Sequence, residues 1–531
     1  MRAMNVVGCV LACAVGGAGS VSAQDKLPWS VGVAKVDITP SYPVRLSGFG
    51  FRRTESEGVT QKIWAKALAI QAKDQQPAVL IAVDNLGIPT YMVDEVARRL
   101  QAKAKLPPER LAITATHTHT APMLKNVAPT LFSVPIPAEH QERIDRYTAE
   151  LTDHLEKVAL TALADRQPAR LSYGIGTAKF GKNRRPQGGP VDHDLPMLAV
   201  YGENDKLRAV YLTYACHCVT LSNNKISGDW AGFAQSILEE NHPGAIALAS
   251  VGCGADQNPT SGVTGDKVDV ARAQGAEIAT EVRRLLGGML TPIRGDLVTK
   301  VKKFELPLAD LPTKEQWEAK AKQKGAVGYH AQINLARLEH GEKIRDKIDY
   351  SVQTWNFGTS LAMVFLPGEV VVDYSLRLKK ELDGRRLWIN AYANDAPCYI
   401  PSERVLKEGG YEGGFAMVYY DLPVPFRPGL EQKIVDTAKD LAGPKFASPI
   451  DFKKCDTMPQ SPQQSLATIQ VRKGLKVELV VAEPLISSPV AIDFGPDGKL
   501  WVAEMADYPL GAKGNYEPGG RIKLLQSSRG M

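Results

Sequence analysis

The stretch AVYLTYACHCVTLSNNKISGDWAGFAQSILEE, residues 209–240, decides the fold class because a strand, a loop and a helix follow one another in it. Its apolar start predicts a buried strand over 209–214, and the apolar spacing from Trp230 to Glu240 predicts an amphipathic helix. The same alternation recurs between residues 29 and 443, which predicts an α/β catalytic domain of layered mixed sheets with flanking helices. The other predicted strands are 79–83, 111–116 and 245–251, and the other predicted helices are 93–104, 141–164 and 271–286.

The charge balance excludes a nucleic-acid partner. The 531 residues include 64 basic and 58 acidic ones, with a net charge of +6 and no basic block. Nucleic-acid binding needs basic residues gathered on one face, and this pattern predicts an ordinary solvated surface. A highly charged helical stretch at 314–345 is interpreted as a surface excursion without chemistry.

The first 23 residues predict a secretory signal peptide, which implies a secreted or periplasmic protein. Arg2 precedes an apolar run from Val6 to Val15, and small residues end at Ala23. The run has about half of the roughly 20 apolar residues that span a bilayer, and no later segment is long enough, so we expect no transmembrane segment. Five cysteines remain after removal of this peptide, which allows at most two disulfides.

The C-terminal residues predict a separate short module. Residues 444–465 are rich in Pro, Ser, Gln and Lys, which indicates a linker. Residues 466–531 contain four short strand candidates separated by turns, a pattern typical of one β-propeller blade. This tail resembles the start of the propeller in bacterial sugar-dehydrogenase-like proteins, and we expect no redox function of it. The four candidates are 477–482, 490–494, 500–504 and 521–525.

Two histidines stand two residues apart in TATHTHTAPML, residues 114–124. In a strand, alternate side chains share a face, so His117 and His119 are expected to present both imidazoles on one side. An HxH pair of this kind is a candidate metal site, although buried histidines are also common in cores.

Further candidates follow in later loops. His217 ends the apolar strand of the opening stretch, and we interpret the flanking Cys216 and Cys218 as packing because adjacent strand residues point to opposite faces. Asp229 opens the next helix, either as its cap or as a carboxylate supporting a histidine ligand. Asn258 lies in the Gly-rich turn ASVGCGADQNPT, residues 249–260.

Together these segments resemble the neutral/alkaline non-lysosomal ceramidase family over roughly residues 31–430. The resemblance includes VGVAKVDITP (31–40), THTHTAP (116–122), NRRP (183–186), VDHDLPML (191–198), the PGE at 367–369 and the loop containing Tyr399. It implies a zinc-dependent amide hydrolase of sphingolipid metabolism that acts on N-acylsphingosine or a related N-acyl substrate through zinc-activated water. It also implies that Zn²⁺ is held by His117, His217, Glu369 and Tyr399, with His119 as the second active-site histidine.

Three departures from the family bear on the substrate. Asn258 occupies the place of the family's active-site serine, Thr-Ala-Pro follows His119 where the family has Ser-Gly-Pro, and the tail replaces an immunoglobulin-like domain. We expect His119 to assist proton transfer or to hydrogen-bond the developing oxyanion, and Asn258 and Arg184 to donate to the same oxygen or to orient substrate. A metallohydrolase of another amide or ester, and a non-catalytic lipid- or carbohydrate-binding relative, remain alternatives. The expected partner is a small-molecule or lipid amide, which leaves peripheral contact with a membrane surface open.

Overall fold

The computed structural model describes residues 27–448 and, toward the C-terminus, 461–469, 471, 475–482, 484–487, 489–505 and 519–526. The predicted signal peptide (1–23), most of the predicted linker and Cys455 lie outside the described residues. Contacts divide the chain into two compact units, one reaching Pro449 and the other beginning at Ile450. The predicted bounds of a catalytic domain (29–443), a linker (444–465) and a tail (466–531) remain a proposal. Deletion of residues 461–531 tests whether the tail is independent of the first unit.

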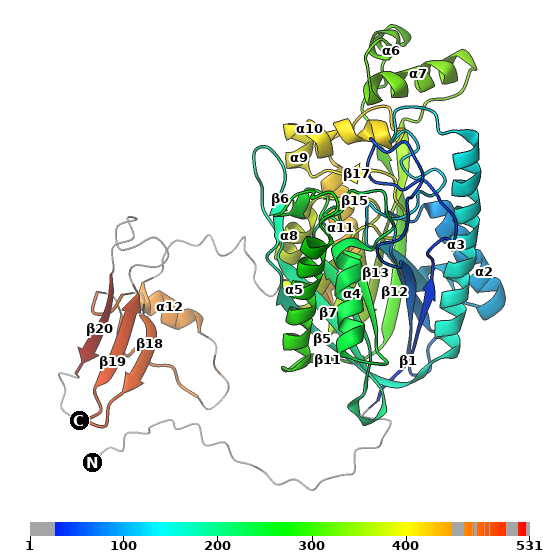
Figure 1. Ribbon diagram of the computed structural model, residues 1–531. Coiled ribbons are helices and arrows are strands. Elements are labelled where there is room, and N and C mark those ends of the chain that lie inside the picture. Colours follow the sequence, from blue (N-terminus) through cyan, green and yellow to red (C-terminus); the bar gives the residue numbers. More distant parts are fainter. Residues whose placement is uncertain are drawn as a thin grey trace. The chain divides into compact units, whose positions relative to one another are not determined.

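The first unit is built around a large mixed sheet of nine strands (Figure 1). Adjacent strands of this sheet are antiparallel except at its two ends, where β3 pairs with β4 and β8 pairs with β9 in parallel. In spatial order the strands are β4 (Leu111–Ala115), β3 (Ala78–Val83), β2 (Trp64–Ala72), β1 (Trp29–Asp37), β5 (Gln167–Thr177), β7 (Asp194–Tyr201), β8 (Leu207–Tyr214) and β9 (Ile246–Val251), with β11 (Thr291–Ile293) paired to β5.

The large sheet curls until the strands at its two ends approach each other. β4 and β9 contact each other without pairing, so the sheet is not a closed barrel. Sheets curl in this way because each strand twists relative to its neighbour. As a consequence, the loops that follow β4 and β8 meet although they lie far apart along the sheet.

A second sheet packs face to face on the first. It consists of β12 (Leu297–Pro307), β13 (Lys347–Phe357), β14 (Leu361–Phe365) and β16 (Leu387–Asn390). Aromatic rings fill the space between the sheets: Trp388 stacks on Tyr211 with ring centroids 4.9 Å apart, and Phe357 meets Trp29 edge-on at 5.7 Å. Rings of this size bury large apolar areas, so this layer is a main part of the core.

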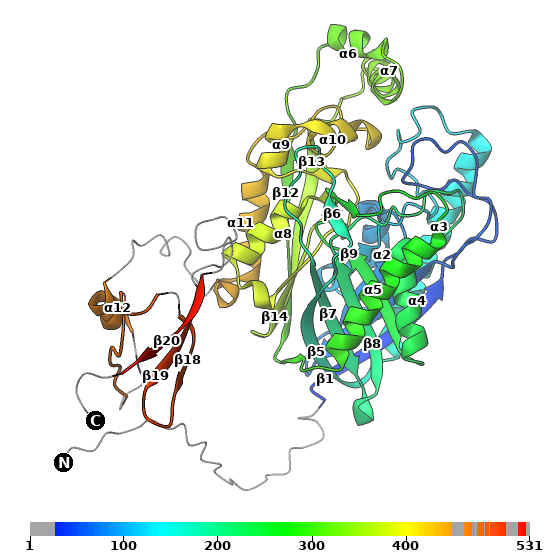
Figure 2. The same cartoon turned by 60° about the vertical axis from the view of Figure 1, so that its left-hand side comes forward.

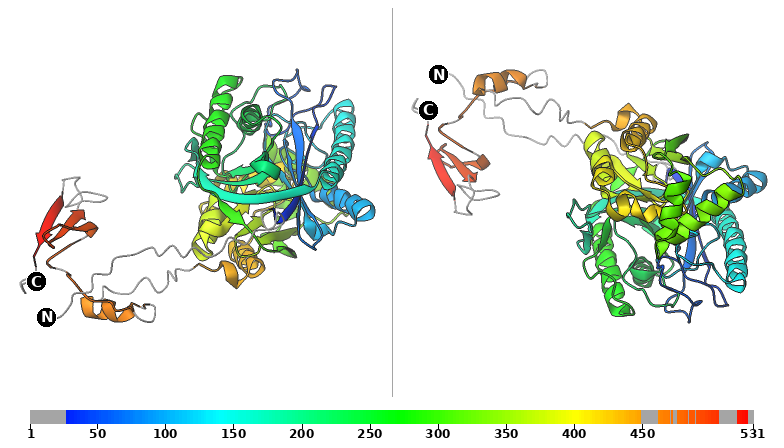
Figure 3. Two further views of the ribbon diagram at one scale, coloured as in Figure 1. Left: turned by 90° about the horizontal axis from the view of Figure 1, so that it is seen from below. Right: turned by 90° about the horizontal axis from the view of Figure 1, so that it is seen from above.

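Helices cover the outer faces of both sheets, which confirms the predicted layered α/β architecture. Seen from below and from above, the blue and cyan helices, the green helices and the yellow to orange helices lie on different sides of the sheets (Figure 3). The helices are α2 (Thr90–Ala104), α3 (Ala138–Ala164), α4 (Asp229–Asn241), α5 (Val268–Leu286), α6 (Lys314–Ala321), α7 (Ala326–Glu339), α8 (Val372–Glu381), α9 (Glu403–Glu408), α10 (Gly410–Gly413) and α11 (Leu430–Ala442).

Short elements gather at one end of the first unit, the end that also carries α6 and α7 (Figures 1 and 2). Two small ladders lie there, β6 (Gly181–Asn183) with β10 (Gln257–Pro259), and β15 (Glu369–Val370) with β17 (Tyr399–Ile400). Five 3₁₀ helices complete the described part of this unit: η1 (Pro108–Arg110), η2 (Glu203–Asp205), η3 (Gly384–Arg386), η4 (Phe415–Tyr419) and η5 (Pro444–Phe446).

The described residues of the second unit form three of the four predicted strands. Its described residues form α12 (Pro462–Thr468) and an antiparallel sheet of β18 (Pro489–Phe494), β19 (Leu500–Met505) and β20 (Gly520–Leu525). The predicted strand at 477–482 was wrong, because these residues carry no strand pairing. Their apolar run satisfies strand propensity, but a strand also needs a partner edge.

Two further expectations concern cysteines and membranes. Cys216, Cys218, Cys253 and Cys398 are buried free thiols, and Cys216 and Cys218 pack in the core as interpreted from the sequence. Among the described residues, none of the helices combines the length and the apolar character needed to cross a bilayer.

Candidate metal centre

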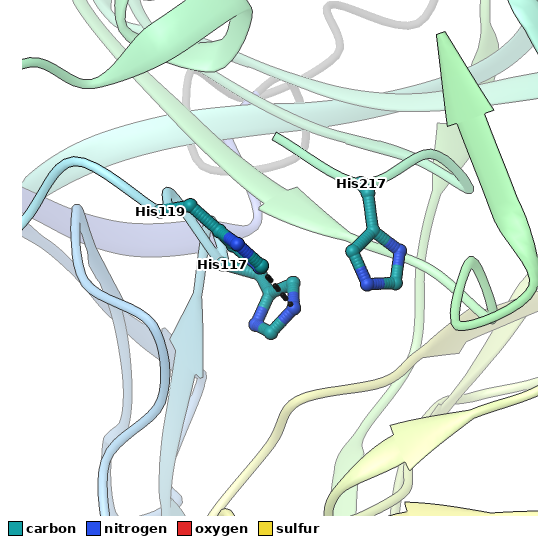
Figure 4. A group of neighbouring side chains, drawn as sticks. All are labelled: His117, His119 and His217. Atoms are coloured by element: carbon teal, nitrogen blue, oxygen red, sulfur yellow. Dashed lines mark hydrogen bonds between the residues drawn. The ribbon is translucent and has the colours of Figure 1, made fainter. Parts of the chain in front are cut away.

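Two loops from opposite ends of the large sheet deliver three histidines. His117 and His119 follow β4, and His217 follows β8. A parallel bridge between Thr118 and Cys218 joins the loops, and the backbone N–H of His119 donates to the Cys218 carbonyl at 3.1 Å. Figure 4 shows the three imidazoles facing one region. Their nitrogen atoms that could bind a metal ion lie within 4.8 Å of one another.

The predicted strand alternation does not explain how the first two histidines meet. β4 ends at Ala115, and His117 has a φ of +55°, in the left-handed region that residues other than glycine rarely adopt. The imidazoles therefore converge through a sharp turn of the chain. Backbone strain of this kind often occurs at functional sites.

The rings of His117 and His217 are held by the same type of hydrogen bond. Nδ1 of His117 donates to the Leu86 carbonyl at 2.7 Å, and Nδ1 of His217 donates to the Gly254 carbonyl at 2.8 Å. A carbonyl oxygen can only accept, so each Nδ1 carries a proton and Nε2 is the ring nitrogen left to face the neighbouring groups. Burial, together with the nearby Arg184 guanidinium, lowers the pKa of His217 to about 4, which keeps this ring neutral.

Glu369 completes the convergence from the second sheet. It pairs with Tyr399 in the β15–β17 ladder, and its Oε2 lies 3.1 Å from Nε2 of His117 and 3.2 Å from Nε2 of His217. The Tyr399 hydroxyl is 3.4 Å from Nε2 of His217.

These atoms fit a bound cation. Among the described residues, Oε2 of Glu369 is buried without a hydrogen-bond partner and faces Nε2 of His117 and Nε2 of His217, so these three atoms form a set of ligand atoms that a positive charge between them would satisfy. Zinc binds nitrogen and oxygen ligands at about 2.0–2.1 Å in a tetrahedron, whose ligands are then about 3.3 Å apart. The distances of 3.1, 3.2 and 3.4 Å agree with that spacing.

His119 differs from the other two histidines in its anchoring. Its Nε2 lies 3.1 Å from Nε2 of His117, but its buried Nδ1 has no hydrogen-bond partner in the described part of the chain. Burial and the neighbouring imidazoles place its pKa well below the usual value. Metal-binding histidines usually have the second ring nitrogen fixed, so this free Nδ1 distinguishes His119 from His117 and His217.

A small cavity opens beside Glu369, Tyr399 and His119. Its volume of about 20 Å³ has room for about one water molecule. Gly48 lies against the His119 ring with a φ of +86°, and a Cβ there would come within 2.4 Å of that ring. Four tyrosines form much of the wall, namely Tyr399, Tyr411, Tyr419 and Tyr420.

Arg184 connects the other predicted residues to this centre. It follows the β6 strand and donates to the Tyr399 hydroxyl at 3.1 Å and to Oδ1 of Asn258 at 3.1 Å. Pairing of β6 with β10 brings the two segments together, with Asn258 opposite Lys182. The structure therefore places Arg184 one hydrogen bond, and Asn258 two hydrogen bonds, from the predicted ligand Tyr399.

The structure does not bring Asp229 to a histidine side chain. Its two carboxylate oxygens accept from the backbone N–H groups of Leu221 and Trp230, and burial raises its pKa to about 6. The Nδ1 atom that it could have supported on His217 is occupied by the Gly254 carbonyl. The interpretation as the helix cap is wrong as well, because Gly228 is the N-cap of α4 and no side chain of the described residues caps this end, while Asp229 is the first helical residue and accepts from the adjacent Trp230 N–H.

Sequence reasoning missed three residues of the site. The Tyr420 hydroxyl donates to Oε1 of Glu369. The centroid of the Tyr392 ring lies 4.3 Å from that of the His117 ring, and the backbone of Tyr392 is left-handed. Glu412 accepts from Nε of Arg184 at 2.8 Å. Tyrosines are common in cores and gave no signal, whereas Tyr-Glu between two glycine pairs, residues 409–414, was a pattern that could have drawn notice.

Comparisons with known proteins confirm the resemblance predicted from the sequence. Residues 29–253 match the family described as neutral/alkaline non-lysosomal ceramidase, N-terminal, and residues 461–530 match a domain of unknown function, DUF7133. No curated protein matches the chain.

Two solved structures are similar to the chain as a whole. A ceramidase complexed with C2 has a TM-score of 0.63 and 17% identity, with 91% of this chain and 85% of that chain covered. The neutral ceramidase from Pseudomonas aeruginosa has a TM-score of 0.61 and 19% identity, with 91% and 84% covered. The chain therefore has the neutral ceramidase fold.

Proposed function

We propose that this protein is a zinc-dependent amide hydrolase of the ceramidase type, acting on N-acylsphingosine or a related N-acyl compound. The observation that carries the proposal is the buried Glu369 carboxylate oxygen 3.1 and 3.2 Å from the Nε2 atoms of His117 and His217. The ceramidase match over residues 29–253 supports the reaction class.

The proposed ligands are His117, His217, Glu369 and Tyr399. Zinc bound there would act as a Lewis acid toward the amide carbonyl and would lower the pKa of water toward neutrality. Burial and the Glu369 carboxylate raise the pKa of Tyr399 well above its usual value, whereas the Arg184 guanidinium, which donates to the Tyr399 oxygen, opposes that shift and would support a metal-bound phenolate. Tyr420 donates to Glu369 and holds its other oxygen toward the histidines.

We assign proton transfer to His119. It lines the cavity, and its ring is not anchored at Nδ1 as the two proposed ligand rings are. A neutral imidazole can accept a proton from water and return it to the leaving nitrogen. Asn258 has no ionisable or nucleophilic atom, so its proposed role is to hold Arg184 in position or to donate to the developing oxyanion.

The test combines metal content with hydrolysis of an N-acyl amide panel. Wild-type protein should contain about one zinc per chain and hydrolyse at least one amide, and chelation should abolish the activity. His217→Ala should lose zinc, whereas His340→Ala, at an exposed position after α7, should keep it. Full zinc occupancy in a folded His217→Ala variant would refute the ligand assignment, and failure of the zinc-loaded wild type on the whole panel would refute the activity.

A further inference from the structure

A larger cleft adjoins the cavity at the proposed metal ligands. Its volume of about 390 Å³ lies within the range of about 300–1,000 Å³ that small-molecule sites occupy. Tyr411 lines both the cleft and the small cavity, and Arg184 lines the cleft while donating to Tyr399. The cleft is thus the space next to the site into which one side of a bound amide can extend.

The charges in this cleft neutralise one another. Arg184 donates to one oxygen of Glu412 at 2.8 Å, and Arg185 donates to the other at 2.8 Å. Arg185 also donates to Glu408 at 3.0 Å. Two positive and two negative side chains are therefore paired, and an ionised ligand group would have to displace an existing partner.

An alkyl chain can contact the apolar atoms that make up most of the exposed wall of this cleft, but it satisfies none of the charged groups there. It would remove water from the arginine and glutamate groups and offer no hydrogen bond in return, which is unfavourable. A neutral group with several hydroxyls avoids this cost, because each guanidinium has five N–H donors and each carboxylate has further lone pairs. The lining therefore favours an uncharged, hydroxylated ligand.

Tyr411 supplies a flat apolar surface beside these polar groups. Its side chain is 42% exposed, and it follows Gly409 and Gly410, both at positive φ. A sugar ring has one face of C–H groups and an edge of hydroxyls. Such a ring can lie on the tyrosine while its hydroxyls reach the paired charges.

We propose that the cleft binds a hydroxylated ring on the amine side of the scissile bond, so that the substrate is an N-acyl amino sugar and not the amide of a long-chain base. The inference rests on the proposed function for the hydrolysis step. In that step the C–N bond breaks, the oxygen of water bonds to the acyl carbon, and the nitrogen leaves with a proton from water. The carboxylic acid so formed passes its proton to the released amine, which gives a carboxylate and an ammonium ion as products.

The first experiment compares two amides that share one acyl group. Full-length zinc-loaded protein should hydrolyse N-octanoylglucosamine with at least tenfold higher kcat/KM than N-octanoylsphingosine. Gln187→Trp, which fills the cleft from an exposed loop position, should raise KM for the sugar amide about tenfold with kcat and zinc content unchanged. Gln101→Trp, on the exposed side of α2, is the matched control and should change nothing.

A binding experiment separates this inference from the proposed activity. N-acetylglucosamine should bind to the wild type and to Gln101→Trp, as measured by ligand-observed NMR, and should lose affinity for Gln187→Trp. Sugar binding with this loss, but without hydrolysis of any amide, would support the cleft and refute the proposed function. Preference for the sphingosine amide together with an unchanged KM in Gln187→Trp would overturn the inference while the proposed function stands.

Discussion

Replacing Tyr420 by phenylalanine removes one hydroxyl and leaves the ring in place. That hydroxyl donates to Oε1 of the buried Glu369, whose Oε2 faces the two proposed histidine ligands. A hydrogen bond to an ionised acceptor contributes about 1.5–3 kcal/mol. Loss of an outer partner of a metal ligand weakens metal binding by about 10–100-fold, or about 1.4–2.7 kcal/mol. We therefore expect the zinc Kd of Tyr420→Phe to rise at least tenfold.

Competition with a chromophoric chelator at constant pH measures this Kd, and urea unfolding of the metal-free protein checks the fold. Tyr419→Phe is the matched control, because Tyr419 lines the same cavity while the hydroxyl on Glu369 comes from Tyr420. A Kd for Tyr420→Phe within twofold of the wild type would refute the idea that this tyrosine orients the carboxylate. An equal loss in Tyr419→Phe would refute it as well, since general loosening of the wall would then explain both.

Four further predictions concern the rest of the site and the tail. His119→Ala should keep its zinc by elemental analysis but lose about 100-fold or more in kcat, as expected for proton transfer; loss of zinc would instead make it a ligand. Arg184→Ala leaves the buried Glu412 carboxylate with one partner fewer and should lower the free energy of unfolding by about 3 kcal/mol in urea titrations. The control Arg284→Ala, from an exposed ion pair, should lower it by less than about 1 kcal/mol. Equal effects of the two substitutions would contradict this prediction. Deleting 461–531 should leave the melting temperature and zinc content of the first unit nearly unchanged, and a large drop in either would mean that the tail belongs to its fold. Because Asn258 cannot act as a nucleophile, intact mass spectrometry during a single turnover should show no acylated protein, and a stoichiometric adduct on any side chain would overturn this mechanism.

Local pattern predicted most elements of the first unit. The apolar run at 79–83 became β3, and the amphipathic stretches at 141–164 and 271–286 became most of α3 and α5. These predictions succeeded because strand and helix periodicities are properties of short segments that bury one face or one stripe. The same reasoning failed at 477–482, where an apolar run has no strand pairing.

The sequence by itself also picked out the chemistry-bearing residues. Paired histidines, the PGE glutamate and the loop with Tyr399 stood out because several separated segments occurred in the order of a known family. Their spacing along the chain, however, placed no two of these segments in contact. The prediction that strand alternation places His117 and His119 on one face was wrong, because the strand ends at Ala115 and the chain then turns sharply at His117.

Only the tertiary structure decided how these residues work together. Curling of the large sheet brings the loops after β4 and β8 into contact, and the second sheet supplies Glu369 from beside them. The carbonyls of Leu86 and Gly254, which no sequence pattern marks, fix a proton on Nδ1 of each proposed ligand histidine. Backbone carbonyls have no side-chain identity, and the pairing of distant segments depends on sheet twist and packing over the whole unit. For these physical reasons the relative positions of the proposed metal ligands, the partner of Glu369 and the contacts of Asp229 could be learned only from the folded chain.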